Sequence, residues 1–584
     1  MKLTSDIEKS NKISASSVRG DKKNTSAIMH STNINDSHGS TYLLSLMDSA
    51  LWLLGREPEL QTIEIVLHPA GGFHTPQSIF QGLKRRFFRL PSFILGALKR
   101  RLGRVNQAQP YAFNSQTGVK KDVDAETISI FAQVLEGHHP VVLTTTIGTI
   151  TIHRSGHHLI RSMKDGVRTY FTARRLWRTC HENGVLQPHR LLQLEYRGIV
   201  IGDLIASTAL RLYPEAGGSV QGCPGLWPVL TNAIAICDYI AINIPNDCQN
   251  SYVVNPEPTY YDAVYLRQLY EQGACNITRH HYGKDFFLMS PPNEMHIPMV
   301  VQTNELIPAS DEDILRAKNY MQERIDQPNR LWYMFEGANS TDELLWDIED
   351  NLIELTEVGP YAVVCLHSFD DGQYHFGFDG FDDIYHWTIF TINQLIDNLN
   401  VTKVFIKPHP NTNFIDYIGD GVAFERLSNL YAGNRKVIWL RKDCSLKAIA
   451  KLDKIVGITH HGSVAEELTY LGVPVIASAF APWGTAFAFV SMWRSPEEYE
   501  ALLNHLSGKN WAAPSIAMID ALLGYVVDYR LRIPSIASRK TWMKFGQWAD
   551  GEVPAPNQAT FYDFCQRLEP VSYTHLTLPT IYSV

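Results

Sequence analysis

The residues best suited to chemistry in this sequence begin with a short polar segment that directly follows an apolar run. Lys407 and His409 each precede a proline in K-P-H-P, which comes straight after V-F-I. Proline lacks a backbone donor and biases the residue before it toward extended geometry, so residues two apart project to one face. We therefore expect a cation and an imidazole side by side at a strand's carboxyl end, where open α/β sheets bind ligands.

A second segment repeats this logic at residues 459–468, T-H-H-G-S-V-A-E-E-L, which follow an apolar, β-like run. His461 and Gly462 belong to the predicted turn, and Ser463 begins the predicted helix. Such a helix start offers unpaired amides and a favourable dipole to an anion. The alternative is that Ser463 and Glu466 form only a capping box, which does not need Glu467.

These two segments resemble a known family. K-P-H-P followed further along by H-G-S-V-A-E-E-L-T-Y-L-G-V-P-V-I is similar to the C-terminal half of GT-B-fold surface-carbohydrate and capsular-polysaccharide biosynthesis proteins. The stretch Y-R-G-I-V-I-G-D-L-I at residues 196–205 and the segment 260–273 resemble the N-terminal half of those proteins. The resemblance covers residues 190–505, with a looser similarity to nucleotide-sugar 2-epimerases.

The resemblance implies an α/β, GT-B-like fold of two Rossmann-type domains that face a central cleft. It implies a metal-independent glycosyltransferase acting in bacterial capsule or surface polysaccharide assembly. The donor would be a CMP- or UDP-linked sugar, used as substrate with no tightly bound cofactor, and the acceptor a glycan or glycolipid. By analogy with the epimerases Glu467 would hold the ribose. The residues expected to hold the donor are Lys407, His409, His461, Gly462, Ser463 and Glu467.

The catalytic candidates are Asp203, Asp370 and His409. Asp203 follows a predicted strand in the acceptor-side half, where it is a candidate general base or only the cap of the next helix. Asp370 belongs to D-D-G, which resembles the acid-acid-glycine motif of some CMP-sugar transferases, although its gap to His409 is much shorter than in those enzymes.

Two other functions stay open at this point. A sugar-nucleotide 2-epimerase would share the phosphate site but would need acids around the sugar and no acceptor. A non-catalytic polysaccharide assembly protein could keep the fold without nucleotide binding.

Composition sets wider limits. The 584 residues are 45% hydrophobic and 19% charged with a net charge of −8, which gives no global case for nucleic-acid binding. The eight cysteines are scattered without a C-x-x-C pair, so we predict no metal site, no disulfide framework and a reducing cytoplasm. We expect neither a signal peptide nor a membrane span.

The predicted organisation has five parts: a disordered tail at 1–40, an N-terminal acceptor-side α/β domain at 41–340, a C-terminal nucleotide-sugar-binding Rossmann-like domain at 341–510, a helical segment at 511–571, and a tail at 572–584 that we expect to be non-native. Within the first domain, residues 83–104 mix arginines and lysines with bulky apolar residues. That segment could make a peripheral contact with an anionic membrane, which would place the protein at the inner face of the cell membrane. The alternatives are a solvated basic face and a groove for an acidic acceptor.

Three local predictions complete the picture. Residues 239–244 should form a strand, and the helix within 516–531 should return to the first domain. The arginines in 161–180 could meet acceptor phosphates or face water, and we favour water.

Overall fold

The protein is described from a computed structural model. It describes residues 26–32, 50, 53–54, 59–68, 141–144, 148–155, 163–244, 248, 251–253, 259–279, 286–289, 308–326, 359–374, 376–410, 412, 418–441, 444–452, 454–506 and 512–531. The predictions for 1–25, 83–104, the domain junction near 330–358 and the tail 572–584 lie outside these residues.

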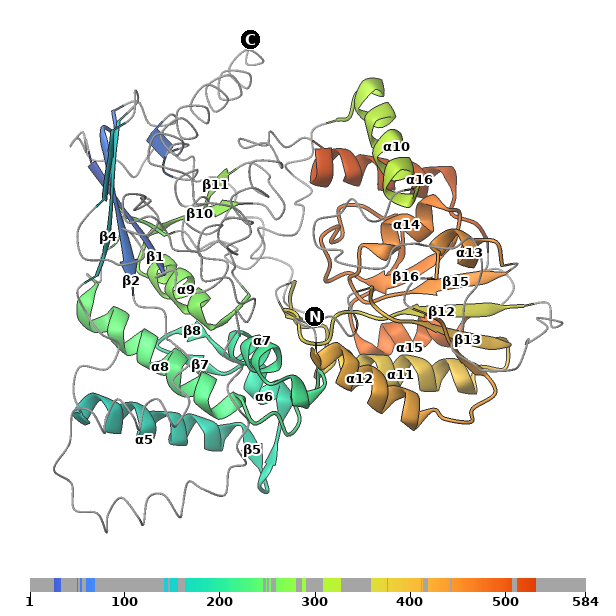
Figure 1. Cartoon of the computed structure of the whole chain (residues 1–584), viewed down its shortest axis with the longest axis horizontal. Helices are drawn as coiled ribbons and strands as arrows, with labels where there is room; N and C mark the ends of the chain where they lie inside the picture. Colours follow the sequence, from blue (N-terminus) through green and yellow to red (C-terminus); the bar gives the residue numbers. More distant parts are fainter. Residues whose placement is uncertain are drawn as a thin grey trace, which may run out of the picture.

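The C-terminal domain is built on a parallel sheet whose two central strands are buried along their whole length (Figure 1). Numbered along the chain, its strands follow the order 3-2-1-4-5-6 of a dinucleotide-binding domain. Such strands are apolar throughout because helices cover both faces. In spatial order the strands are β14 (Val437–Trp439), β13 (Lys403–Lys407), β12 (Tyr361–Cys365), β15 (Ile455–Ile458), β16 (Val475–Ser478) and β17 (Ser491–Trp493).

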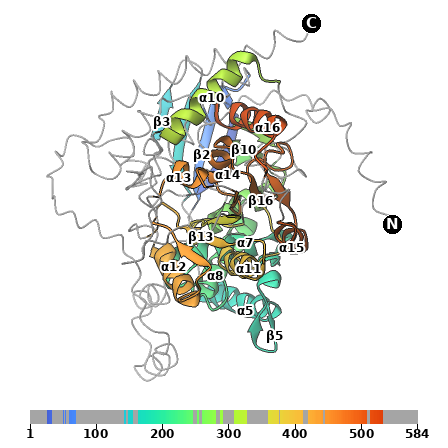
Figure 2. The same ribbon diagram turned by 90° about the vertical axis from the view of Figure 1, so that its right-hand side faces the viewer.

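Alternate residues of β12 enter two different cores. Ala362 and Val364 pack with α11 (Ile384–Asp397), α12 (Ile418–Leu430) and α15 (Pro496–Asn504). Val363 and Cys365 pack on the other face, and Figure 2 shows the two helical layers on either side of the sheet. The helices of the second face are α10 (Asp311–Asp326), α13 (Leu446–Ala450), α14 (Val464–Tyr470), α16 (Ile516–Val526) and the π-helix Val527–Leu531.

Two elements of that second face depart from expectation. Ala317 and Met321 of α10 are fully buried in the C-terminal core, although α10 precedes the predicted boundary at 340. The helix α16 also packs here, against α10 and α14, rather than crossing to the N-terminal domain. In both helices the apolar side chains face this sheet, so packing assigns them to the C-terminal domain.

The N-terminal domain has a mixed sheet with a parallel centre and an antiparallel strand at each edge. Its strand β1 lies between β9 and β2, so the predicted disorder of residues 1–40 is wrong for this stretch. Ala27 and Met29 are buried while Ile28 is 40% exposed, a two-residue alternation that fits a strand. The strands are β11 (Phe286–Met289), β10 (Cys275–Arg279), β9 (Ser251–Val253), β1 (Ser26–Thr32), β2 (Thr62–His68), β4 (Thr149–Arg154) and β3 (Val141–Thr144).

Helices make up the other layer of this domain, and their apolar residues form its largest described core. Residues 239–244, predicted as a strand, belong instead to the end of α8 and its cap, because this apolar run continues the helix that starts at Leu226. The elements are α5 (Met163–Thr179), α6 (Pro188–Leu192), α7 (Gly202–Leu212), η2 (Pro214–Ala216), α8 (Leu226–Asn243), η3 (Tyr261–Ala263), α9 (Val264–Glu271) and the hairpins β5–β6 (His181–Glu182, Val185–Leu186) and β7–β8 (Glu195–Tyr196, Ile199–Val200).

Among the described residues, α8 alone is long and apolar enough to cross a membrane, and 67% of that stretch is buried within the protein. This is how the core helix of a soluble domain behaves, so length and composition here are weak evidence for a span.

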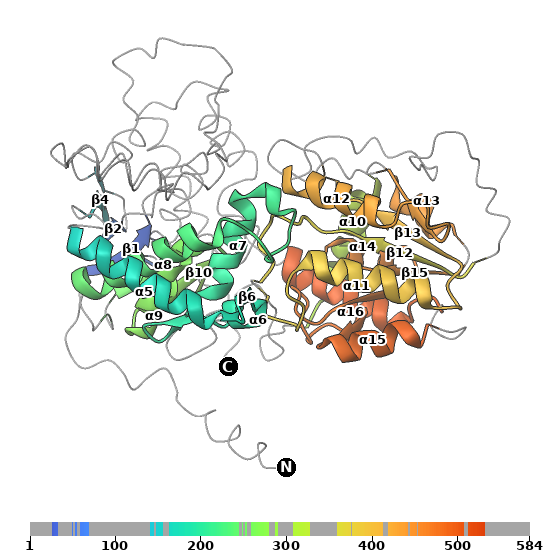
Figure 3. The same ribbon diagram turned by 90° about the horizontal axis from the view of Figure 1, so that it is seen from below.

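The domains meet through the segment around η2 and the loop after β12. Arg426 of α12 donates to the carbonyl oxygens of Glu215 and Ala216, at 2.7 Å each. The amide of Val220 donates to Asp383, the residue that caps α11. The α/β class is thus confirmed, and the arrangement is GT-B-like: two α/β domains lie side by side, with the C-terminal strands ending in loops that reach the N-terminal domain (Figure 3).

Candidate functional site

The two predicted polar segments lie at the same edge of the C-terminal sheet. They follow β13 and β15, which flank β12 and run parallel to it. Neighbouring strands are about 4.8 Å apart, so the two loops are separated by roughly two strand spacings. The chain order reverses between β12 and β15, and in open α/β sheets ligands bind outside the carboxyl ends at such a point.

The Lys407–His409 pair lies at the carboxyl end of β13, as predicted. Lys407 ends β13 beside Cys365, and its side chain is buried. Burial lowers the pKa of His409 to about 4, with Lys407 adding to that fall and Asp371 opposing it. The ring is therefore neutral at pH 7, so the pair offers one cation and one neutral imidazole.

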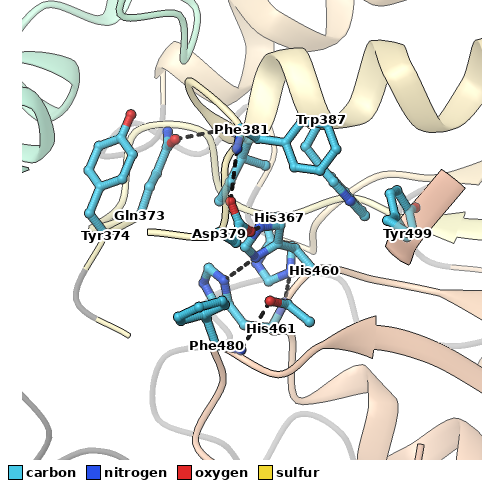
Figure 4. Close-up of polar contacts among 12 residues, drawn as sticks. His367, Gln373, Tyr374, Asp379, Phe381, Trp387, His460, His461, Phe480 and Tyr499 are labelled. Atoms are coloured by element: carbon cyan, nitrogen blue, oxygen red, sulfur yellow. Dashed lines mark hydrogen bonds and ion pairs between the residues drawn. The ribbon is translucent and has the colours of Figure 1, made fainter. Parts of the chain in front are cut away.

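A cluster of histidines occupies the switch point between β12 and β15 (Figure 4). His367 follows β12, and its ring centroid lies 4.3 Å from that of His461. The backbone amide of His461 donates to Nε2 of His367 at 3.1 Å. This contact ties the loop after β15 to the loop after β12.

His460 links that cluster to a buried acid. Its Nε2 lies 2.5 Å from Oδ2 of Asp379, an ion-pair contact without the angle of a hydrogen bond. Its Nδ1 lies 2.7 Å from Nδ1 of His461. One of these two nitrogens must carry the proton and the other a lone pair. If His460 carries its proton on Nε2, toward the acid, then His461 donates from Nδ1 and the lone pair of its ring lies on Nε2.

Aromatic rings hold His460 in place. The rings of Trp387 and Trp493 stand edge-on to it at 5.3 Å and 5.4 Å, and Tyr499 stacks on Trp387. His460 and Asp379 are 6% and 7% exposed. The acid–histidine contact is therefore a fixed support beneath His461, whose own ring keeps some contact with solvent.

Gly462 is required where it stands. A Cβ at this position would lie 2.9 Å from Oγ1 of Thr459 and 3.1 Å from Cε1 of His367. A side chain here would crowd Thr459 in its own loop and His367 in the loop after β12, so both would have to shift. The glycine therefore allows the close contact between the loops after β12 and β15.

The predicted capping box is wrong. Ser463 has a helical backbone conformation and makes no capping hydrogen bond. Glu466 is buried and accepts from Arg530 at 2.7 Å and from Arg324 at 3.2 Å. Burial works to raise the pKa of Glu466, but the two guanidinium groups bring it below its ordinary value.

Glu467, expected to hold the ribose, is in contact with the same arginine of α10. Its Oε1 accepts from Nε of Arg324 at 2.5 Å, so one oxygen is already held by α10. Burial raises the pKa of Cys365 to about 12, and Glu467 adds to this rise while Lys407 opposes it. Both charged groups thus act on the thiol at the end of β12.

Neither carboxylate predicted as the general base stands open to a ligand. Both oxygens of Asp203 accept from the guanidinium of Arg267, at 2.6 Å each, and no capping bond is present. Asp370 is 2% exposed and accepts from the amide of Gly419. Burial, opposed by Arg211, raises the pKa of Asp370, and its neighbour Asp420 is raised well above the ordinary value by burial and by Asp370.

Asp371 has the position expected of Asp370. Its side chain is exposed, its Oδ1 accepts from the hydroxyl of Tyr260 in the N-terminal domain at 3.0 Å, and its charge acts on His409. Sequence reasoning passed over Asp371, and it assigned no role to His367, Asp379 or His460. For His367 and Asp371 the available signal was the polar run H-S-F-D-D-G directly after a buried strand.

No described group of three or more His, Cys, Asp or Glu residues has an arrangement that could hold a metal ion. Among the described cysteines, six have free thiols, and all six are buried.

Comparison with known proteins gives only distant likenesses. No protein family and no curated protein matches the chain. Among solved structures it is similar to the "OtsA apo structure" (10% identity, TM-score 0.28, 91% of this chain and 100% of that one). A trehalose-6-phosphate protein from E. coli bound with UDP-2-fluoro glucose (10%, 0.24, 91% and 100%) and an alpha,alpha-trehalose 6-phosphate synthase from Burkholderia multivorans (10%, 0.26, 95% and 100%) are similar to the same slight degree. None of these likenesses assigns the chain an activity.

Proposed function

We propose that this protein is a metal-independent glycosyltransferase that takes a nucleotide-activated sugar, CMP- or UDP-linked, and acts in the assembly of bacterial capsule or surface polysaccharide. One observation carries the proposal: the loops after β12, β13 and β15 bring a lysine, histidines and a close-packed glycine to one edge of the sheet, at its topological switch point.

The chemistry asked of this edge is to stabilise a leaving nucleotide phosphate. Lys407 supplies the fixed positive charge, and His409 and His461 supply imidazole nitrogens. Groups held in place before the reaction cost no reorganisation as charge develops, and removing one donor of this kind costs about 2.7–4 kcal/mol of transition-state stabilisation. The support of His460 and Asp379 holds His461 in this way.

Asp371 is the best-placed acceptor for the proton of the attacking hydroxyl. It is exposed and contacts Tyr260 across the domain interface, so it lies where an acceptor held by the N-terminal domain would meet a donor held by the C-terminal one. Asp203 and Asp370 would first have to give up Arg267 and Gly419.

The test is a nucleotide panel followed by thermal unfolding. A nucleotide present at 100 times its dissociation constant should stabilise the fold by about 2.7 kcal/mol. We expect His409→Ala and His461→Ala to lose that shift. His505→Ala, which removes an exposed imidazole at the end of α15, should keep it. A wild-type protein that no nucleotide stabilises would leave only the non-catalytic assembly role.

Product analysis then separates the two enzymatic functions. The purified protein is incubated with UDP- and CMP-sugars, with and without a glycan acceptor. Free nucleotide that forms only when acceptor is present supports transfer. An epimerised donor without acceptor identifies a sugar-nucleotide 2-epimerase instead.

A further inference from the structure

The exposed face of α5 joins apolar and basic side chains in one stripe. The helix packs along α8 at the lower edge of the N-terminal domain in the view of Figure 1, and Figure 3 shows it from below. Thr169 and Ala173 are buried on its inner side. On its outer side, Val167 is 47% exposed and Phe171 is 60% exposed. Each is an apolar side chain that the fold itself leaves in water.

The charges on this helix are strongly one-sided. It carries five basic residues and one acidic residue, Asp165, in a protein whose net charge is −8. Arg168 contacts Asp165 and the buried Asp238. The other four basic side chains are exposed and make no ion pair with any described residue; they are Lys164, Arg174, Arg175 and Arg178.

Helical geometry places these groups together. At 3.6 residues per turn, Val167, Phe171 and the five basic residues fall within roughly one third of the helix circumference. The arginines lie on the same strip as the two apolar side chains rather than on the opposite face. The stripe is therefore a flat strip of cations with Phe171 near its middle.

We propose that this stripe docks the protein on an anionic lipid bilayer. Each basic group near an anionic leaflet contributes to attraction, and long basic side chains reach the headgroups while apolar neighbours enter the acyl boundary. Phosphates of a nucleic acid would use the arginines but would give Phe171 and Val167 no apolar environment. The surface is separate from the nucleotide site, and the inference does not depend on the proposed function.

The experiment is sedimentation of the full chain with vesicles of phosphatidylcholine alone or mixed with phosphatidylglycerol, without nucleotide. We expect binding to the mixed vesicles only, weakened by salt. A variant with Arg174→Gln, Arg175→Gln and Arg178→Gln should bind roughly 100-fold more weakly, about fivefold per charge. Phe171→Ala should bind roughly tenfold more weakly, because part of an aromatic burial is lost.

Matched controls come from the C-terminal domain. Arg435→Gln, Lys451→Gln and Lys454→Gln together remove three exposed basic groups, and Leu399→Ala removes an apolar side chain that is 99% exposed. Both control variants should bind like the wild type. All substituted side chains are exposed, so the thermal midpoint of each variant should be unchanged. If the triple variant unfolds, Phe171→Ala alone still tests the proposal.

Other results overturn the proposal. These are no binding of the wild type to the mixed vesicles, equal binding to phosphatidylcholine alone, and an equal loss in the control variants. Retention of binding by Phe171→Ala, together with displacement from vesicles by a single-stranded RNA oligonucleotide, would identify a polyanion site instead.

Discussion

Two polar regions of the C-terminal domain, the ion-pair network of Glu466 on α14 and the histidines at the sheet edge, differ in how far they are buried. The network of Glu466, Arg324 and Arg530 encloses its charges completely, with side chains that are 0%, 2% and 11% exposed. At the sheet edge, His461 and His409 stand on buried supports but keep part of their rings in contact with solvent. The first region fixes architecture, and the second leaves functional groups able to meet a ligand.

The largest expected effect breaks the enclosed network. Arg530→Met removes the charged partner of Oε1 of Glu466 and leaves that oxygen only the hydroxyl of Tyr525 at 3.4 Å, while Arg324 keeps Oε2. We expect the free energy of unfolding in urea to fall by about 3 kcal/mol, the lower end of the range for breaking a buried ion pair. Lys447→Met breaks the exposed pair with Asp326 and should change little. Equal effects of the two substitutions would remove the contrast between enclosed and exposed charges.

An intermediate effect is expected at the sheet edge. Gly462→Ala forces the loops after β12 and β15 apart, which should lower the free energy of unfolding by about 1–3 kcal/mol and abolish the nucleotide-dependent thermal shift. Gly524→Ala is the matched control, because its Cβ would meet only an ordinary contact 3.4 Å from Phe487. In the interior of α16 that alanine should stabilise by about 0.5–1 kcal/mol. A full nucleotide shift in Gly462→Ala would contradict the site.

The smallest effect concerns pH. The pKa of His409 is about 4 in the folded protein, below the ordinary value of 6.5. Between pH 4 and pH 6.5, the imidazole therefore binds a proton in the unfolded chain but not in the folded one. Stability from this group is present above pH 6.5 and is lost as pH falls toward 4. His409→Gln cannot take up this proton, so over this pH range the free energy of unfolding of the variant should fall by about 1 kcal/mol less than that of the wild type. The expected difference is this small because His409 keeps some contact with solvent. Identical pH profiles of wild type and variant would show that the imidazole is not held neutral.

The sequence predicts the C-terminal sheet well, and the reason is local. Residues 361–366, 403–407 and 455–459 are short apolar runs that end in polar turns, and each one is a buried parallel strand with its turn at the common edge. Two prolines fix the placement of Lys407 and His409. These features depend on neighbours in the chain, so a pattern can reveal them.

The errors come from partners that are distant in sequence. S-x-x-E fits a capping box, but Glu466 finds Arg324 and Arg530 instead, and neither lies near it in the chain. Asp203 fits a strand-end acid, but Arg267 occupies both its oxygens. The strand at 26–32 has few large apolar residues, and its burial follows from the strands on either side of it. Charge pairing and sheet position are tertiary properties.

The placement of α10 has a consequence for how the chain can be divided and how it matures. The C-terminal unit is completed by a helix that precedes its first strand and by a segment that ends at residue 531. A fragment begun at residue 341 would lack Arg324. During synthesis, Glu466 would emerge from the ribosome well before Arg530 could reach it, so the last steps of folding must wait for that arginine.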